Sequence, residues 1–240
     1  YTLDLYKELE KTVDHSPGLR LNGALSIAEN KGRWQELQRQ ATTAQLYDVD
    51  VQILSKDQIK KKYPIVNTDK VLGGILMPGD GAADPSGVTH MLAKAAKMEG
   101  AKIYEKSPVS EILTKSGRIS GVKVNDQIID CEYIVLASGM WSRQIGEKVD
   151  VSIPLYPAEH FYIITEPIKN LSSNLPVIRD FDNRTYIKED AGKILVGIFE
   201  GNSIPAWDKT NIVPENFSFG EFQENFEHFE PYLNSAIKRF

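Results

Sequence analysis

The order of segments in the middle of the chain constrains its fold more than any other feature. Asp84 and Pro85 are typical of the cap and first residue of a helix, and this helix is expected to end at Gly100. AKIYE (101–105) then reads as a strand, followed by three strand-like runs separated by Ser-Gly and Asn-Asp turns. The apolar run YIVLA (133–137) predicts one more strand. We therefore expect a three-stranded meander inserted between two strands of an α/β sheet.

The turn after that last strand is the first candidate binding feature. In LASGMW (136–141), a strand, a glycine and a bulky aromatic precede a helix, which lets the main chain approach a large flat ligand. The segment order is typical of the second half of a flavin dinucleotide domain, where the Ala137-Ser138-Gly139 turn approaches the cofactor. On spacing alone, Gly139 is equally consistent with a plain strand-to-helix turn and Trp141 with a core residue.

The glycine-rich turn that holds a pyrophosphate, Gly-x-Gly-x-x-Gly, is not found in these 240 residues. The chain begins with Tyr1 inside a helical pattern and stops at IKRF, within what reads as another helix. We expect an internal piece of a longer protein, whose first strand and pyrophosphate turn lie outside it. The rest of the chain is predicted to form strands at 152–167, 175–180, 185–190 and 193–200, and a helix at 219–240.

Composition excludes several classes of function. The chain has 28 basic and 33 acidic residues and a net charge of -5, with no basic run longer than the three lysines at 60–62, so no nucleic-acid partner is expected. Its single cysteine, Cys131, rules out an internal disulfide and a cysteine-based zinc site and is read as a small apolar strand residue. No apolar run approaches the roughly 20 residues of a membrane helix, so no membrane span is expected.

Several motifs together resemble one flavoprotein family. DGAADPSGVTHMLAKAAKMEGAKIYEKSPV, the glutamate-histidine strand in AEHFYIITEPI, and LPVIRD are similar, in order, to the middle of the dimethylglycine/sarcosine dehydrogenase group. That group lies within the D-amino-acid-oxidase-like superfamily of FAD-dependent oxidoreductases. The region VSIPLYPAEHFYIITEPI and the final FEHFEPYLNSAIKRF also resemble the regulatory subunit of pyruvate dehydrogenase phosphatase, a relative that acts as a protein partner.

The resemblance implies FAD as cofactor, with Val109 and Trp141 at positions that contact it. It implies that a second sheet covers the flavin ring and that His160 and Tyr186 are the active-site histidine and tyrosine. Flavin N5 would accept hydride from an N-methyl carbon, and the resulting iminium would release formaldehyde or pass its carbon to tetrahydrofolate, which is possible in the full-length protein. The final flavin-contacting loop and the folate region are expected outside this chain.

The proposed roles agree with the chemistry of the residue types. Hydride leaves an N-methyl carbon only when the nitrogen lone pair is free, and a histidine suits the task of deprotonating the amine. Without the resemblance, His160 reads as a core histidine and Tyr186 as a half-buried strand aromatic. Arg184 and Lys188 could attract a substrate carboxylate, although solvated strand-edge charges are favoured. The remaining histidines, His15, His90 and His228, are not spaced as a metal site, and no metal is expected.

The sequence therefore predicts a mixed α/β fold with two parts. Residues 79–150 are assigned to part of a Rossmann-like FAD-binding domain with the inserted meander, and 1–78 and 151–240 mainly to a mixed or antiparallel-sheet substrate domain. The predicted activity is FAD-dependent oxidative N-demethylation of a small N-methyl amino acid, dimethylglycine or sarcosine. The alternatives are a non-catalytic regulatory subunit and another amine oxidase of the superfamily. A bacterial, cytoplasmic protein is expected, or a mitochondrial matrix protein if the source is eukaryotic. The electron acceptor is not indicated.

Overall fold

The computed structural model describes residues 1–210 and 212–240, and the chain forms two compact units. We name them the sheet unit and the meander unit. The assignment of residues 79–150 to a flavin domain stays a prediction. The sheet unit comprises Tyr1–Ala101, His160–Asn202 and Glu224–Phe240, and the meander unit comprises Lys102–Glu159 and Ser203–Gln223.

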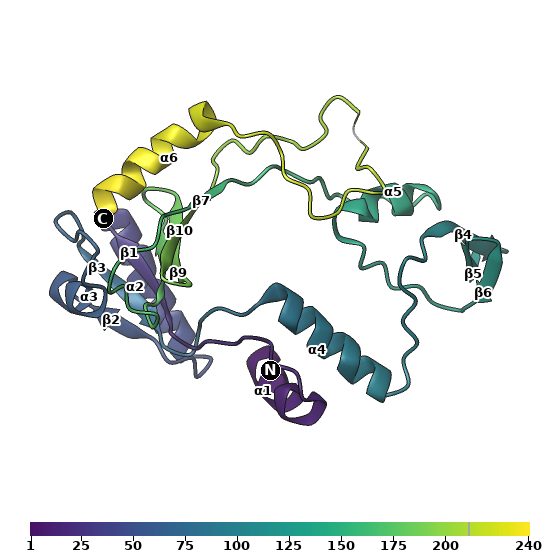
Figure 1. The fold of residues 1–240 in the computed structure, drawn as a ribbon, viewed down its shortest axis with the longest axis horizontal. Coiled ribbons are helices and arrows are strands. Elements are labelled where there is room, and N and C mark those ends of the chain that lie inside the picture. The colour runs from purple at the N-terminus through teal and green to yellow at the C-terminus, as the bar shows by residue number, and fades with distance from the viewer. Residues whose placement is uncertain (211) are drawn as a thin grey trace. The chain divides into compact units, whose positions relative to one another are not determined.

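The sheet unit is built on a mixed seven-stranded sheet (Figure 1). Within the described residues, β1 and β8 pair in parallel and all other neighbours pair antiparallel. A mixed sheet confirms the predicted fold class. In spatial order the strands are β2 (Gln52–Leu54), β3 (Gly73–Met77), β1 (Ala24–Ala28), β8 (Val177–Asp180), β9 (Thr185–Asp190), β10 (Lys193–Ile198) and β7 (Tyr162–Ile164).

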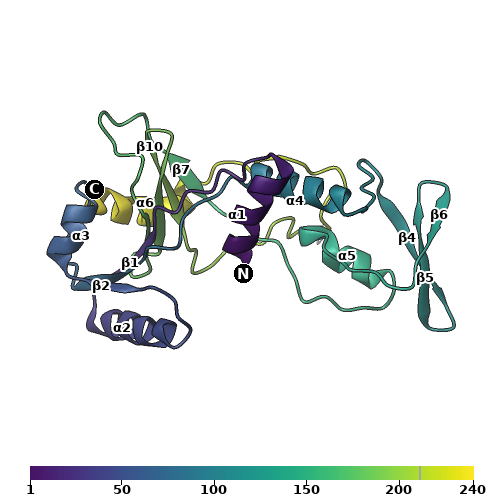
Figure 2. The same cartoon turned by 90° about the horizontal axis from the view of Figure 1, so that it is seen from below.

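The two faces of this sheet differ in what covers them. One face carries the main core, where α3 (Lys56–Lys62) and α6 (Phe226–Arg239) pack on apolar side chains that alternate along each strand. The opposite face is covered near β1 and β3 by α2 (Lys31–Gln45), as Figure 2 shows. Fully or nearly fully buried core side chains include Leu25, Ile27, Ile178, Ile187, Ile194 and Val196 on the first face, and Ala28, Leu37, Ala41 and Ile75 between α2 and the sheet.

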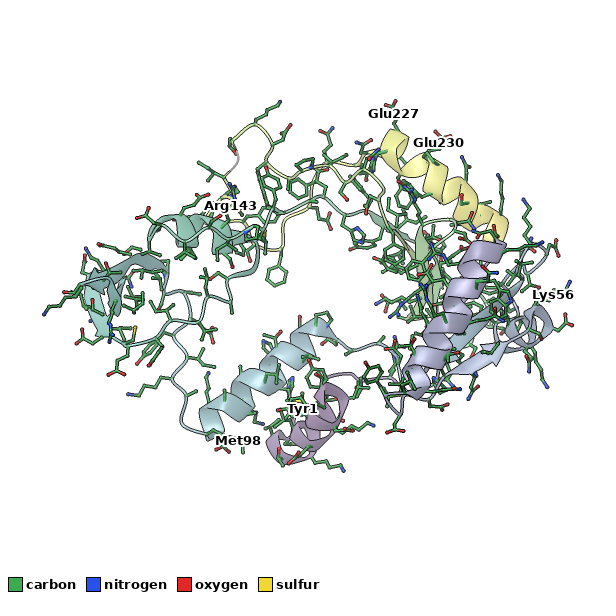
Figure 3. All side chains as sticks on the ribbon, turned by 180° about the vertical axis from the view of Figure 1, so that it is seen from behind. Tyr1, Lys56, Met98, Arg143, Glu227 and Glu230 are labelled. Atoms are coloured by element: carbon green, nitrogen blue, oxygen red, sulfur yellow. The ribbon has the colours of Figure 1, made fainter. Side chains whose placement is uncertain are left out.

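Local signals set the helix boundaries. Ser55 caps α3 through a complete capping box with Gln58, and the Asp84 carboxylate accepts from the backbone N–H groups that begin α4 (Pro85–Met98). The cap at Asp84 was predicted from the sequence. The α4 helix pairs with α1 (Thr2–Val13), and Figure 3 labels Met98 at the end of α4 and Tyr1 just before α1.

The helix α6 is amphipathic and is held by a buried cation. Phe229 and Ala236 face the core, whereas Glu227 and Glu230 project away from the sheet (Figure 3). Arg239, near the end of the helix, donates two hydrogen bonds to the buried Asp180 carboxylate at 3.0 and 2.8 Å. It also pairs with Glu29 and donates to the Asn67 carbonyl, so one side chain ties α6 to three other segments of the sheet unit. No helix of the described residues is long and apolar enough to cross a membrane.

One core phenol stands apart from its apolar neighbours. Tyr63 is fully buried, and within the described residues its hydroxyl has no hydrogen-bond partner. Burial raises the pKa of Tyr63 strongly, and the negative charge of Glu189 raises it further. The phenol therefore remains neutral in the folded state well above the pH at which an exposed tyrosine ionises.

The meander unit contains the predicted three-stranded antiparallel sheet, formed by β4 (Val109–Lys115), β5 (Arg118–Val124) and β6 (Gln127–Asp130) (Figure 1). The Ser116-Gly117 turn has two residues in the left-handed region, which is typical of tight hairpin turns, and Asn125 has the same conformation at the next turn. The chain then passes through a short 3-10 turn (Gly139–Trp141) into α5 (Ser142–Glu147).

Several predicted elements are wrong in extent. AKIYE and YIVLA are not strands, because an extended segment becomes a strand only beside a hydrogen-bonded neighbour and the described residues provide none. Their side chains are exposed accordingly, Tyr133 at 86% and Val135 at 89%. Cys131 lies just after β6, not in a strand. The strand expected at 152–167 is reduced to β7, since Pro154 and Pro157 cannot donate to a ladder. The last helix begins only after its Asn225 cap.

Candidate functional site

The candidate site in the sheet unit lies on the face that carries α2, but over different strands. Along β9, Thr185, Ile187 and Glu189 point into the core, so Tyr186 and Lys188 alternate onto the opposite face. In the described residues of the sheet unit, no helix packs on the β8–β10 part of that face. Tyr186 is therefore presented on a rigid sheet surface while remaining only half-buried.

A glycine on the neighbouring strand determines how Tyr186 lies. Gly197 of β10 is the direct cross-strand partner of Tyr186, and Tyr162 of β7 is the next residue in the same row. A Cβ atom on Gly197 would lie 2.0 Å from Tyr186 Cζ and 2.2 Å from its hydroxyl oxygen. Because Gly197 has no side chain, the phenol ring lies across β10 and its hydroxyl reaches toward β7.

His160 meets the tyrosine hydroxyl from the segment just before β7. Its Nε2 atom lies 3.4 Å from the Tyr186 oxygen, and the two rings are nearly parallel, 13° apart with centroids separated by 6.0 Å. The His160 side chain is 49% exposed, so a small molecule can reach it. The structure thus brings together the two residues that the sequence analysis assigned to the active site, while their catalytic roles stay predictions.

Glu200 is part of this arrangement and was missed by the sequence analysis. Its Oε2 atom lies 2.8 Å from His160 Nδ1, and its Oε1 accepts a hydrogen bond from the Phe161 N–H at 3.1 Å. The Glu200 side chain is only 3% exposed. One signal was present, since KILVGIFE ends an otherwise apolar strand with a carboxylate. Nothing in the sequence linked that carboxylate to a histidine forty positions earlier.

The electrostatics of the site favour a neutral phenol. Burial raises the pKa of Tyr186, and electrostatic repulsion from Glu200 and from the neighbouring Tyr162 phenol raises it further. Ionising this phenol would put a second negative charge near a buried carboxylate. At neutral pH Tyr186 is therefore a hydrogen-bond donor rather than a base.

Aromatic rings and one cation border the His160–Tyr186 pair. Phe199 packs against the Tyr186 ring with centroids 5.4 Å apart and stacks on Phe181 at 5.3 Å. Arg184 folds back over Gly201, with Nη1 only 1.7 Å from where a Cβ atom on that glycine would lie. Its guanidinium is thereby placed beside the residue that follows Glu200. Lys188 is half-buried two positions beyond Tyr186 on the same face.

A second candidate site lies entirely within the meander unit. A pocket of about 600 Å³ is lined by all five residues that were predicted to contact the cofactor, together with Pro108, Gln144, Ile145, Lys148 and Glu215. The five are Val109, Ala137, Ser138, Gly139 and Trp141.

Hydrogen bonds hold the pocket wall in place. Trp141 Nε1 donates to the Pro214 carbonyl at 3.0 Å, and the Gln144 amide makes two hydrogen bonds with the Val213 backbone. Gly139 has a left-handed φ of 53°, and nothing lies within 4 Å of the place where its Cβ would be. The bare backbone and apolar walls fit part of a dinucleotide cofactor, whose remaining groups require residues beyond this pocket.

No metal chemistry is suggested at either site. In the residues that the structure describes, no group of three or more His, Cys, Asp or Glu side chains could hold a metal ion. His15 and His90 contact each other edge to face with centroids 5.9 Å apart, without further ligands of that kind.

Comparison with known protein families decides the family. The model of the family described as "DAO: FAD dependent oxidoreductase" matches residues 1–240, the whole chain. The chain belongs to this family of FAD-dependent oxidoreductases. The predicted resemblance is thus confirmed at the level of the family.

Three curated relatives show how this family member compares with others. The chain is 35% identical over 236 residues to 4-methylaminobutanoate oxidase (formaldehyde-forming) of Paenarthrobacter nicotinovorans, covering 98% of the chain and 28% of the relative. It is 32% identical over 238 residues to mitochondrial sarcosine dehydrogenase of Homo sapiens, covering 97% and 25%. It is 31% identical over 242 residues to the mitochondrial pyruvate dehydrogenase phosphatase regulatory subunit of Mus musculus, covering 100% and 27%.

A solved structure supports the same fold for this oxidoreductase-family chain. L-proline dehydrogenase from P. horikoshii matches 98% of the chain and 60% of its own chain, with a TM-score of 0.83 and 24% sequence identity. At that identity the match concerns the fold alone. The chain spans about a quarter of the length of the curated relatives it matches.

Proposed function

We propose that this chain is the catalytic part of an FAD-dependent enzyme that oxidatively N-demethylates a small N-methyl amino acid, sarcosine or dimethylglycine. The observation that carries the proposal is the pairing of His160 Nε2 with the Tyr186 hydroxyl on an accessible sheet face. Two relatives support the substrate class, because their names give 4-methylaminobutanoate and sarcosine as substrates. For the first of them formaldehyde is a named product.

FAD, when bound, supplies the acceptor for the two electrons that leave the substrate as hydride. Val109, Trp141 and the 137–139 backbone would hold part of it, since they line one pocket with apolar walls. The protein's own task is to prepare the amine. An N-methyl ammonium has no lone pair to stabilise loss of hydride from the adjacent carbon, so one proton must first be removed.

His160 is the group that can accept this proton. Its imidazole is half exposed, and its Nε2 atom faces the side on which Tyr186 presents a hydroxyl. The neutral Tyr186 phenol donates a hydrogen bond that orients the substrate. Arg184, whose guanidinium is held against the Gly201 backbone, would pair with the substrate carboxylate.

Anaerobic flavin reduction tests the proposed function. The full-length protein is purified, its flavin spectrum is recorded, and it is mixed anaerobically with sarcosine or dimethylglycine. Loss of the oxidised flavin band on mixing is the expected result. The same experiment on His160→Ala should show reduction slowed by about 10²-fold or more with FAD retained. An unchanged rate would remove His160 from the reaction.

A regulatory role is the second candidate. It is favoured by the 31% identity to a phosphatase regulatory subunit, which extends over the whole chain. The amine experiment separates the two, since bound flavin that neither sarcosine nor dimethylglycine reduces would favour the regulatory function. Reduction by a different amine would instead assign the chain to another amine oxidation.

A further inference from the structure

We propose that Glu200 is a positioning residue that holds His160 in the tautomer with its proton on Nδ1, leaving Nε2 as the acceptor for the substrate proton. This inference rests on the proposed function, because it explains how His160 is prepared to deprotonate an amine. The carboxylate does not touch the substrate in this arrangement. It acts through the imidazole.

Both carboxylate oxygens of Glu200 have a contact, and together these contacts determine which nitrogen of His160 carries the proton. Oε1 accepts from the Phe161 N–H at 3.1 Å, and Oε2 lies 2.8 Å from His160 Nδ1. An ionised carboxylate can only accept hydrogen bonds, so Nδ1 must carry the proton. A neutral imidazole has one N–H, and therefore Nε2 carries the lone pair.

The contact at His160 Nε2 is consistent with this assignment. Tyr186 lies 3.4 Å from Nε2, and its phenol is neutral and so has a proton to donate. In the free site the hydroxyl donates to Nε2. The chain of donors therefore runs in one direction, from Tyr186 through His160 to Glu200.

Burial makes the carboxylate more effective. At 3% exposure the Glu200 charge is poorly screened, whereas the histidine it contacts is half exposed. When a substrate ammonium arrives, its N–H bond breaks and a new bond forms at His160 Nε2. The imidazolium produced has a negative partner already in contact at Nδ1, so no second proton transfer is needed once the Tyr186 hydroxyl has turned its proton from Nε2 to the substrate. Residues that hold a base in its reactive tautomer in this way have large effects on rate.

Replacement of Glu200 by Gln gives a sharp test, because the backbone dictates how the amide must lie. The Phe161 N–H requires an acceptor, so the Gln carbonyl oxygen takes that place and the NH₂ group faces Nδ1. Nδ1 must then accept, and the proton moves to Nε2. The variant keeps the size of the side chain but inverts the tautomer.

The tautomer is measured directly by ¹⁵N NMR of the full-length protein labelled at histidine, at a pH where the ring is neutral. His160→Asn identifies the signal of residue 160 among those of the other histidines. We expect a protonated Nδ1 in the wild type and a protonated Nε2 in Glu200→Gln. The matched control is Glu166→Gln, an exposed glutamate near β7, which should leave the wild-type tautomer unchanged. Circular dichroism checks that each variant is folded.

The second readout is anaerobic flavin reduction in the full-length protein. Glu200→Gln should reduce the limiting rate by about 10²- to 10⁴-fold with little change in substrate affinity. Glu200→Asp, which restores the negative charge, should recover part of the rate. An effect on affinity alone, or equal losses in the Asp and Gln variants, would contradict the positioning role.

The two readouts separate failure of the inference from failure of the proposed function. If no amine reduces the wild-type flavin, the proposed function is wrong, but the NMR result still decides whether Glu200 fixes the tautomer. If amines reduce the flavin and Glu200→Gln keeps either the wild-type tautomer or the wild-type rate, the positioning role is overturned while N-demethylation stands.

Discussion

Replacement of Gly197 by Ala is the most direct test of the geometry at the candidate site. The added Cβ atom would lie 2.0, 2.2 and 2.3 Å from three atoms of the Tyr186 ring and hydroxyl. Non-bonded carbon atoms approach to about 3.5–4.0 Å, so the ring must retreat by about 1.5 Å or more. A shift of that size takes the hydroxyl out of hydrogen-bonding range of His160 Nε2, from which it is now separated by 3.4 Å.

Gly197→Ala has two opposing effects on the free energy of unfolding. Overpacking of this kind destabilises by about 1–3 kcal/mol. Alanine in a strand is favoured over glycine by about 0.5–1 kcal/mol, because glycine loses more backbone freedom on folding. The clash is the larger effect, so Gly197→Ala should lower the free energy of unfolding. In a Tyr186→Ala background the clash with the ring disappears, and the same substitution should instead stabilise the protein by about 0.5–1 kcal/mol.

The assays are urea unfolding of the chain and anaerobic flavin reduction in the full-length protein. We expect Gly197→Ala to slow reduction by about 10²-fold, the size associated with misplacing a reacting group by about 1 Å. Gly79→Ala is the matched control, since that glycine is exposed and its Cβ would meet nothing within 4 Å. If Gly197→Ala destabilises equally with and without the Tyr186 ring, or leaves the reduction rate unchanged, the account of this site is refuted.

Three further substitutions test other parts of the structure. Tyr63→Phe should remove a loss of stability that the wild type shows above pH 10. Above that pH the unfolded Tyr63 releases its proton while the folded phenol, with its raised pKa, keeps it, so each pH unit lowers the unfolding free energy by up to about 1.4 kcal/mol. Urea unfolding at pH 9–11 measures the difference. Arg239→Met should lower the unfolding free energy by about 3–5 kcal/mol in the same assay, because the buried Asp180 carboxylate loses its cation; a change below 1 kcal/mol would contradict that pairing. Gly139→Ala should decrease the FAD content of the purified full-length protein, since it adds a side chain at a residue that lines the pocket. Gly117→Ala imposes a similar left-handed backbone strain of about 1 kcal/mol outside the pocket and should keep its FAD.

Local chemistry explains which elements were predictable from the sequence. The cap at Asp84 and the turns at Ser116 and Asn125 act over two to four residues, so their effect is written in neighbouring positions. The meander between them follows from the same local signals. AKIYE and YIVLA have equally strong strand composition, yet a strand also needs a partner, and composition does not say whether one is present.

The candidate site shows the same limit at the level of side chains. His160 and Tyr186 could be named because the surrounding motifs resemble a known family, but their contact depends on the register of β9, β10 and β7. That register places Gly197 beside Tyr186, and the missing Cβ lets one ring cross a strand. A glycine in the middle of an apolar strand is a visible signal of close approach, although its partner is known only once the strands are paired.

Predicting Glu200 as a site residue would have required one more inference than predicting His160 and Tyr186. Glu200 lies two residues after β10, which ends at Ile198, and the Phe161 N–H then orients its carboxylate toward His160. The tautomer of the histidine is therefore a consequence of strand register rather than of any local motif. A substitution that shifted the register of β10 by one residue would move the side chains of β10 to the opposite face and displace the segment that carries Glu200. Chemistry at this site is thus coupled to the pairing of β7 with β10, which places Tyr162 opposite Gly197.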